Sequence, residues 1–234
     1  MNNELFSSLV TNKKIAIIGP APHLEGRNLG NFIDSYDVVC RINELHVPQK
    51  YEKSYGSKTN VVFHNLNSTD GVRDFKRDLK LYPKQSESLD MIICPQKSHD
   101  DAGVNIINLF QEYNLYNTPL LHVGDNFVHA ACTIAGAKVN TGIISILYLL
   151  QFQIKELFVS GFSFYNEGIM STDSYREDIS LQGGLAYKCG EASHPQAPQK
   201  ELFKKLLSEY PTIIKIDSYL KNILGVEHQN VHNL

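Results

Sequence analysis

Four short apolar runs of the sequence each lead directly into residues that can bind a ligand. These residues are Gly19-Pro20, Arg41 and Asn43, Asn65 after His64, and Gly161-Phe162. Glycine lets a backbone approach its ligand closely, the asparagine amide both donates and accepts hydrogen bonds, and arginine carries a fixed positive charge. Groups of these kinds, brought together, suit an anionic nucleotide.

A further candidate is Asn140-Thr141-Gly142, which stands at the start of an expected helix that runs to Gln151. The N-terminus of a helix has unpaired backbone amides and the positive end of the helix dipole, and both attract phosphate. Asparagine is also a frequent N-cap residue, and a simple cap is its more common role. The sequence leaves both interpretations of Asn140 open.

One histidine stands where it could act as a base. His194 follows a stretch from 166 to 193 that shows no sustained period, and it precedes an expected helix that begins near Pro198. Loops of such length inside compact domains are usually lids or binding loops. Imidazole, with a pKa of about 6.5, can take a proton from a hydroxyl at neutral pH. A surface histidine before a proline is the more common interpretation from position alone.

Potential metal ligands are scattered along the sequence. None of the nine histidines forms a His-x-x-x-His pair on an expected helix, and no Asp-x-Asp run occurs. The cysteines show no Cys-x-x-Cys pair, and they are Cys40, Cys94, Cys132 and Cys189. We therefore expect a site that needs no metal, and reduced thiols.

The same apolar runs predict the elements that position these residues. The run at 15–18 lacks polar alternation, as is typical of a strand covered on both faces of a parallel sheet. Further strands are expected at 36–41, 61–63, 89–94, 120–123, 157–160 and 213–216, and helices at 68–81, 100–113, 125–137 and 140–151, near 198 and from 218. Ligands of open α/β sheets bind at the carboxyl ends of the strands, so we expect the four exits to converge there.

Composition fits one globular domain. The 234 residues are 42% hydrophobic and 20% charged. We predict an α/β fold, with residues 1–234 forming a single Rossmann-like domain that has a mostly parallel sheet, helices on both faces and a flexible lid at about 166–193. The dinucleotide fingerprint Gly-x-Gly-x-x-Gly and the P-loop lysine are both absent from the sequence.

Charge and hydropathy limit the partners. A net charge of −3 and a pI near 6.3 argue against nucleic acid. No apolar run approaches 18 residues, so no transmembrane segment is expected. The first residues lack the basic start and apolar centre of a signal peptide, which predicts a cytoplasmic protein. Peripheral contact with a membrane would be compatible with these features.

Two stretches of the sequence resemble motifs of the sialyltransferases, glycosyltransferase families 29 and 42. Residues 19–43 resemble the large sialyl motif, in which Gly19, Gly30 and Arg41-x-Asn43 fall at the motif's spacing. Residues 140–162 are similar to the small motif, which pairs a Ser/Thr-Gly helix start with a strand that ends in Gly-Phe or Gly-Ile. Both motifs occur here in the order that the family shows.

The resemblance implies a fold, a donor and roles for particular residues. It implies a nucleotide-binding sheet with a lid, a sugar donor activated by cytidine monophosphate (CMP), and inversion at the anomeric carbon without a metal. It also implies that His194 is the general base and that Tyr165 contacts the donor phosphate. The residues expected around the donor are Gly19, Pro20, Arg41, Asn43, Asn65, Asn140, Thr141, Gly142, Gly161 and Phe162.

The sequence also departs from the family pattern. Pro20 stands where an asparagine often contacts the nucleotide, and Glu201 follows His194 at a longer spacing than the matching glutamate of family 29. The cysteines that tether the two motifs in luminal enzymes are replaced by Ile15 and Ile154. That loss agrees with a reducing compartment and predicts a bacterial or viral enzyme.

The predicted function is transfer of sialic acid, or a related 2-keto sugar acid, from a CMP-sugar donor to a hydroxyl of a saccharide or glycolipid acceptor. A CMP-Kdo-dependent transferase is one alternative, and an inactive cytidine-nucleotide-binding module is another. A Rossmann methyltransferase would need a glycine-rich first loop and a carboxylate after the second strand, for which only Glu44 is available.

Overall fold

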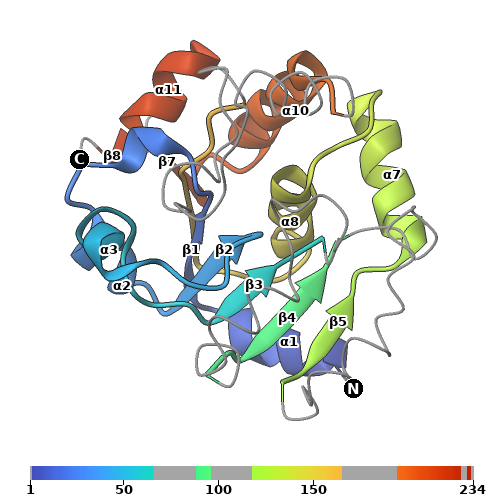
Figure 1. The fold of residues 1–234 in the computed structure, drawn as a ribbon. Helices are drawn as coiled ribbons and strands as arrows, with labels where there is room; N and C mark the ends of the chain where they lie inside the picture. Colours follow the sequence, from blue (N-terminus) through green and yellow to red (C-terminus); the bar gives the residue numbers. More distant parts are fainter. Residues whose placement is uncertain (1, 66–87, 96–117, 165–193, 228–230, 233–234) are drawn as a thin grey trace.

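The computed structural model describes residues 2–65, 88–95, 118–164, 194–227 and 231–232. Within these ranges, eight parallel strands form one sheet in the order β5-β4-β3-β2-β1-β6-β7-β8. The strands are β1 (Lys14–Ile18), β2 (Val38–Ile42), β3 (Val61–Phe63), β4 (Met91–Cys94), β5 (Leu120–His122), β6 (Glu156–Ser160), β7 (Ile214–Asp217) and β8 (Val231–His232). Figure 1 shows this sheet with helices on either side.

The strand order changes direction between β1 and β6. Strands β1 to β5 extend the sheet one way, and β6 to β8 extend it the other way from β1. Ile18 of β1 pairs with Ser160 of β6, so the two strands end level with each other. Such a switch point is where open parallel sheets bind their ligands, at the carboxyl edge.

Helices cover both faces of the sheet, as predicted. The helices are α1 (Asn2–Val10), the 3₁₀ helix η1 (Pro22–Leu24), α2 (Gly30–Asp34), α3 (Gln49–Tyr55), α7 (Asp125–Ala135), α8 (Thr141–Leu149), α10 (Gln196–Glu209) and α11 (Ser218–Leu224). Side chains of α8 and α10 pack on one face with Ile15 and Ile17. Ile33 of α2 and Tyr55 of α3 pack on the other face with Ala16 and Ile18.

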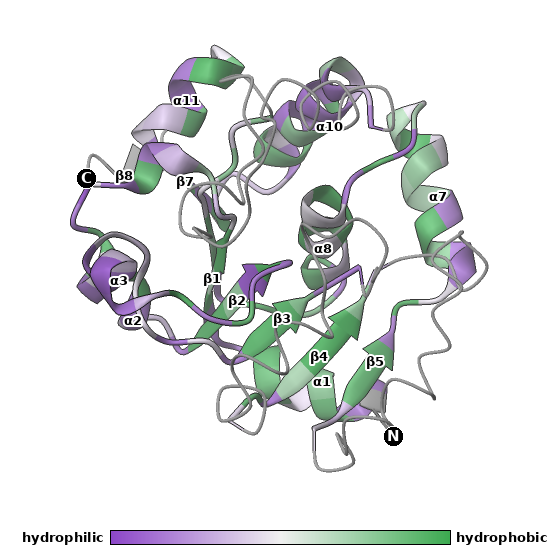
Figure 2. Cartoon of the chain, viewed as in Figure 1, coloured by the Kyte–Doolittle hydropathy of each residue, from purple (hydrophilic) through white to green (hydrophobic). Residues whose placement is uncertain are grey.

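The hydropathy of each element matches its place. Figure 2 shows mainly hydrophobic strands in the centre of the sheet, whereas α3 is mostly hydrophilic and α10 carries mixed polar and apolar residues. Helix α8 has buried residues around most of its circumference, because the sheet lies on one side and α7 lies on another. A helix apolar on all sides is typical of such a central position.

The predicted strands agree with the structure to within two residues at their ends. The range predicted for β3, 61–63, is the range observed, and the strand expected at 36–41 forms β2 at Val38–Ile42. Helices α1, α2, α3 and η1 and strand β8 were not predicted. The helices expected at 68–81 and 100–113, Tyr165, and the lid at 166–193 lie outside the described residues. None of the described helices is long and apolar enough to cross a membrane.

Candidate active site

Four neighbouring strands bring the predicted ligand-binding residues to one edge of the sheet. The sheet order β3-β2-β1-β6 places the strand exits at Asn65, Asn43, Gly19 and Gly161 side by side. All four strands are parallel, so these residues follow the carboxyl ends. The predicted convergence is confirmed.

Gly19 and Gly161 approach each other too closely for any side chain. A Cβ atom on Gly161 would lie 1.9 Å from the Gly19 carbonyl oxygen, and one on Gly19 would lie 2.3 Å from the Gly161 oxygen. Gly161 has a φ of +75°, which few other residues adopt. The Gly19 amide donates to the Ser160 carbonyl (2.9 Å), and the Ala21 amide donates to that of Gly161 (3.0 Å). The two sialyl motifs therefore meet through their backbones.

Phe162 joins the start of α8 to this glycine pair. A Cβ atom on Gly142 would lie 2.4 Å from Cε1 of the Phe162 ring. A Cβ atom on Gly19 would lie 3.3 Å from Cδ2 of the same ring. Gly142 is therefore required because the aromatic ring rests on the first turn of α8.

Asn140 is the N-cap of α8. Its Oδ1 accepts a hydrogen bond from the Ile143 amide at 3.0 Å. Thr141 and Gly142 form the first turn and are buried. Since the cap uses the Asn140 side-chain oxygen, any phosphate at this helix start would be bound by backbone amides and the helix dipole.

Asn43 and Asn65 form one unit. The Asn43 backbone is left-handed, with a φ of +55°, and asparagine adopts this conformation more readily than most residues. Its amide donates to the Phe63 carbonyl (2.8 Å), and its Oδ1 accepts from the Asn65 amide (3.0 Å). The side chain of Asn43 therefore fixes the exit of β3 beside that of β2.

Arg41 anchors the backbone beside the predicted donor site. The side chain is fully buried, and Nη2 donates to the carbonyls of Tyr55 (3.1 Å), Gly56 (3.0 Å) and Lys58 (2.8 Å). Its Nε donates to Thr59 Oγ1 at 2.8 Å. These contacts hold the segment between α3 and β3, so Arg41 has a structural role there.

Gln199 holds His194 beside the start of α8. This glutamine is fully buried, and its Nε2 donates to the carbonyls of His194 (3.2 Å) and Pro195 (3.0 Å). Its Oε1 accepts from the Asn140 amide at 2.9 Å. The His194 carbonyl also accepts from Gln196 Nε2. The predicted base and the predicted phosphate site are thus joined by one side chain.

The sequence prediction missed Gln199 and named Glu201 instead as the match to the family's glutamate. Glu201 lies on the surface of α10, where its side chain is 71% exposed and forms an ion pair with Lys204 at 2.8 Å. Its position therefore gives it no contact with His194. The shorter spacing from His194 to Gln199 was the available signal.

A comparison with protein families matches the first of the two motif-like stretches, residues 19–43. The sequence profile of glycosyltransferase family 29 (sialyltransferase) matches residues 7–112. No curated protein matches the sequence. Within the described residues, no group of three or more His, Cys, Asp or Glu side chains gathers as a metal site would.

Several solved sialyltransferases share the fold over most of the chain. CstII from Campylobacter jejuni with cytidine-5′-monophosphate has 19% identity and a TM-score of 0.57, covering 96% of this chain and 88% of that chain. The α-2,3-sialyltransferase Cst-I from Campylobacter jejuni has 20% identity and a TM-score of 0.56, and the match covers 90% of this chain and 78% of that chain. A mammalian sialyltransferase with Gal-beta-1-3GalNAc-ortho-nitrophenol has 18% identity and a TM-score of 0.53, and the match covers 90% of this chain and 71% of that chain.

These structures show a shared fold, and the profile shows that residues 7–112 are similar to glycosyltransferase family 29. The profile match contains the glycine turn at Gly19 and the exits at Asn43 and Asn65. The structure joins that half to α8 and Gly161 through direct backbone contacts. The chain therefore shares the fold of solved sialyltransferases, and its residues 7–112 match the profile of glycosyltransferase family 29.

Proposed function

We propose that the protein transfers sialic acid, or a related 2-keto sugar acid, from a CMP-sugar donor to a saccharide hydroxyl. The observation that carries the proposal is the single edge on which both sialyl motifs and His194 meet. Two matched CstII structures contain CMP or the analogue CMP-3FNeuAc, which supports the same donor class here. Residues 1–234 act in this proposal as one nucleotide-sugar-binding domain.

The donor is proposed to lie across the switch point. Its nucleoside would lie over Gly19-Pro20 and Asn43, with Asn65 beside the sugar. Its phosphate would lie at the first turn of α8, at Thr141 and Gly142. Amides and a helix dipole stabilise a phosphate without a metal, so we propose that none is required.

Transfer would proceed by direct displacement with inversion. The bond between the anomeric carbon and the phosphate oxygen breaks, and both of its electrons leave with CMP. The acceptor oxygen attacks the electron-poor anomeric carbon from the opposite face, while His194 takes its proton. The positive end of α8 stabilises the negative charge that grows on the departing phosphate. Tyr165, outside the described residues, is the proposed hydrogen-bond donor to that phosphate.

The acceptor is proposed to be a saccharide, free or part of a glycolipid, reached by a cytoplasmic enzyme. One matched CstII structure contains a trisaccharide acceptor with CMP, which supports this class. A glycolipid would need peripheral membrane contact. The alternative donor is CMP-Kdo, because Kdo is also a 2-keto sugar acid that carries a carboxylate next to its anomeric carbon.

The test compares the two donors and one histidine variant. Purified enzyme is incubated with CMP-Neu5Ac or CMP-Kdo, oligosaccharide acceptors and EDTA, and the product is identified by mass spectrometry and its configuration by NMR. We expect an inverted product in EDTA, with kcat at least about 100-fold lower in His194→Ala. His129→Ala on the exposed side of α7 is the matched control. Saturable CMP binding without product or CMP-sugar turnover would instead identify a binding module.

A further inference from the structure

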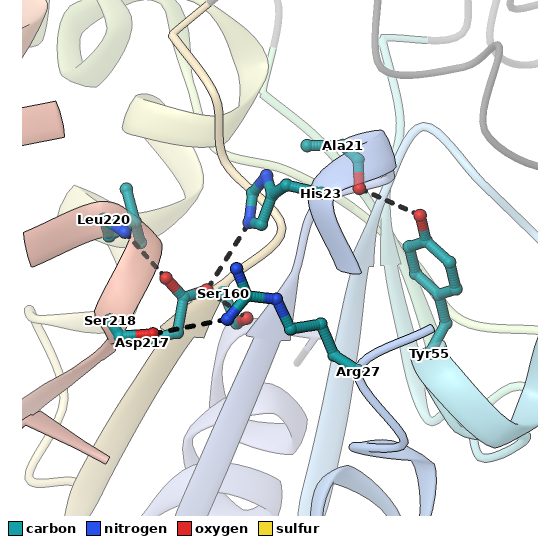
Figure 3. A network of polar contacts seen from close by, with 8 residues as sticks. All are labelled: Ala21, His23, Arg27, Tyr55, Ser160, Asp217, Ser218 and Leu220. Atoms are coloured by element: carbon teal, nitrogen blue, oxygen red, sulfur yellow. Dashed lines mark hydrogen bonds and ion pairs between the residues drawn. The ribbon is translucent and has the colours of Figure 1, made fainter. Parts of the chain in front are cut away.

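A second histidine lies at the same edge, on the other face of the sheet from α8. His23 belongs to η1, three residues after Pro20, and its neighbour Leu24 packs with Ile33 of α2. Figure 3 shows its imidazole above the ends of β6 and β7, beside Ser160 and Asp217. Ser160 lies two residues after Phe158, which packs on this same face.

The imidazole of His23 is fixed on two sides. It stacks on the Tyr219 ring, with 3.8 Å between the ring centroids and an interplanar angle of 10°. Its Nε2 lies 3.6 Å from Asp217 Oδ2, and the His23 side chain is only 4% exposed. A ring held this way presents its remaining nitrogen, Nδ1, in a defined direction.

Asp217 is a charged acceptor. Its Oδ2 accepts from Ser160 Oγ at 2.5 Å, and its Oδ1 accepts from the Leu220 amide at 2.7 Å. Burial alone would raise the pKa of Asp217, but contacts with the imidazole, the hydroxyl and the Leu220 amide hold that pKa below its ordinary value. Because a carboxylate only accepts, the imidazole nitrogen that faces it carries the proton.

The other nitrogen of His23 has no observed partner. Nδ1 is buried and makes no hydrogen bond to any residue in the described part of the chain. Figure 3 shows it pointing away from Asp217. An imidazole that carries its proton on Nε2 has a lone pair on Nδ1 and accepts a hydrogen bond there. A buried polar atom without a partner is costly, and a bound ligand commonly supplies what the protein lacks.

We propose that Nδ1 of His23 accepts a hydrogen bond from an N–H or O–H group of the nucleoside of the bound donor. The proposal rests on the proposed function, which places the phosphate at α8. A nucleoside over Gly19-Pro20, as proposed above, would lie beside η1, which begins two residues after Pro20 and contains His23. Its cytosine amine and ribose hydroxyls are the groups that can donate.

The test uses two variants that separate the nitrogens of His23. His23→Gln keeps a donor that reaches Asp217 but loses the acceptor at Nδ1, whereas His23→Asn keeps a polar group near Nδ1 but falls short of Asp217. Binding of CMP, 2′-deoxy-CMP, 3′-deoxy-CMP and uridine monophosphate is measured by calorimetry. We expect His23→Gln to bind CMP about tenfold more weakly than wild type, and His23→Asn to bind within about threefold.

The analogues identify the donating group. For the analogue that lacks it, wild type and His23→Gln should bind equally. Equal CMP affinity of wild type and His23→Gln would overturn the contact, as would the same loss with all four ligands. If His23→Gln does not fold, the test compares His23→Asn with His23→Ala. CMP affinity retained in His23→Asn supports the contact, whereas an affinity as weak as that of His23→Ala overturns it. Wild type that binds no cytidine nucleotide would overturn the proposed function itself, and the contact with it.

Discussion

Replacing Gln199 with leucine should separate positioning of His194 from folding. The glutamine joins the carbonyls of His194 and Pro195 to the Asn140 amide by three hydrogen bonds. Leucine has a similar size and can make none of them. The loop before α10 would then lose its connection to the start of α8, and His194 would shift relative to the phosphate.

The expected size of the effect follows from these contacts. An unsatisfied buried group costs about 1–3 kcal/mol, and Gln196 still donates to the His194 carbonyl, so we expect a loss of about 2–4 kcal/mol in unfolding free energy. In a chain of this size that lowers Tm by roughly 5–12 °C. A displacement of about 1 Å at the base costs on the order of 100-fold in rate.

The assay measures kcat, donor affinity and Tm of Gln199→Leu below its Tm. We predict that kcat falls 10- to 100-fold while the CMP Kd changes less than about threefold, because His194 acts on the acceptor. Glu201→Gln, on the same helix and exposed, is the control and should retain wild-type kcat and Tm. A lower Tm with unchanged kcat in Gln199→Leu would refute the positioning role.

Three further predictions follow from buried contacts. Gly161→Ala should lower Tm by roughly 5–10 °C and weaken CMP binding at least about tenfold, because the new Cβ would clash with Gly19. Gly136 has a similar positive φ but open space around it, so Gly136→Ala is the control and should bind CMP normally. Arg41→Leu should lower the free energy of unfolding, measured in urea, by about 3 kcal/mol or more, and the CMP Kd of the folded protein should stay within threefold of wild type. An arginine that binds the donor would instead give a weaker CMP Kd with little loss of stability. Asp217→Asn should be less stable than wild type at neutral pH, and the difference should shrink as pH falls below about 4. A carboxyl whose pKa is lowered by folding stabilises the fold fully above its unfolded pKa of about 3.9, and this contribution is lost as pH falls through the folded pKa; a constant difference down to pH 2 would contradict this.

Most of the sheet could be predicted because its central strands are buried on both faces. Strands β3 and β4 are continuous buried apolar runs, and β3 fills the predicted range Val61–Phe63. Strand β8, with two residues, gave no such run and was not predicted. Helix α3 could not be predicted, since its segment QKYEKSY is mostly polar. It is stabilised by Tyr55, which is buried and donates from its hydroxyl to the Ala21 carbonyl at 2.9 Å.

The candidate site could be predicted only where its residues directly follow strands. Gln199 lies 59 residues from the Asn140 amide that it contacts, and nothing in the local sequence records that contact. His23 and Asp217 are likewise joined only by the neighbouring ends of β1, β6 and β7. The structural contacts of Arg41 could not be predicted for a related reason, since these partners are backbone carbonyls, which have no sequence signature.

The most direct test of the central claim is release of CMP from CMP-sugars. Wild type and His194→Ala are compared with CMP-Neu5Ac and CMP-Kdo in the presence of oligosaccharide acceptors. The account predicts acceptor-stimulated CMP release by wild type from one of these donors, reduced at least about 100-fold by the substitution. Equal release by wild type and His194→Ala, or none above background from either donor, would contradict it.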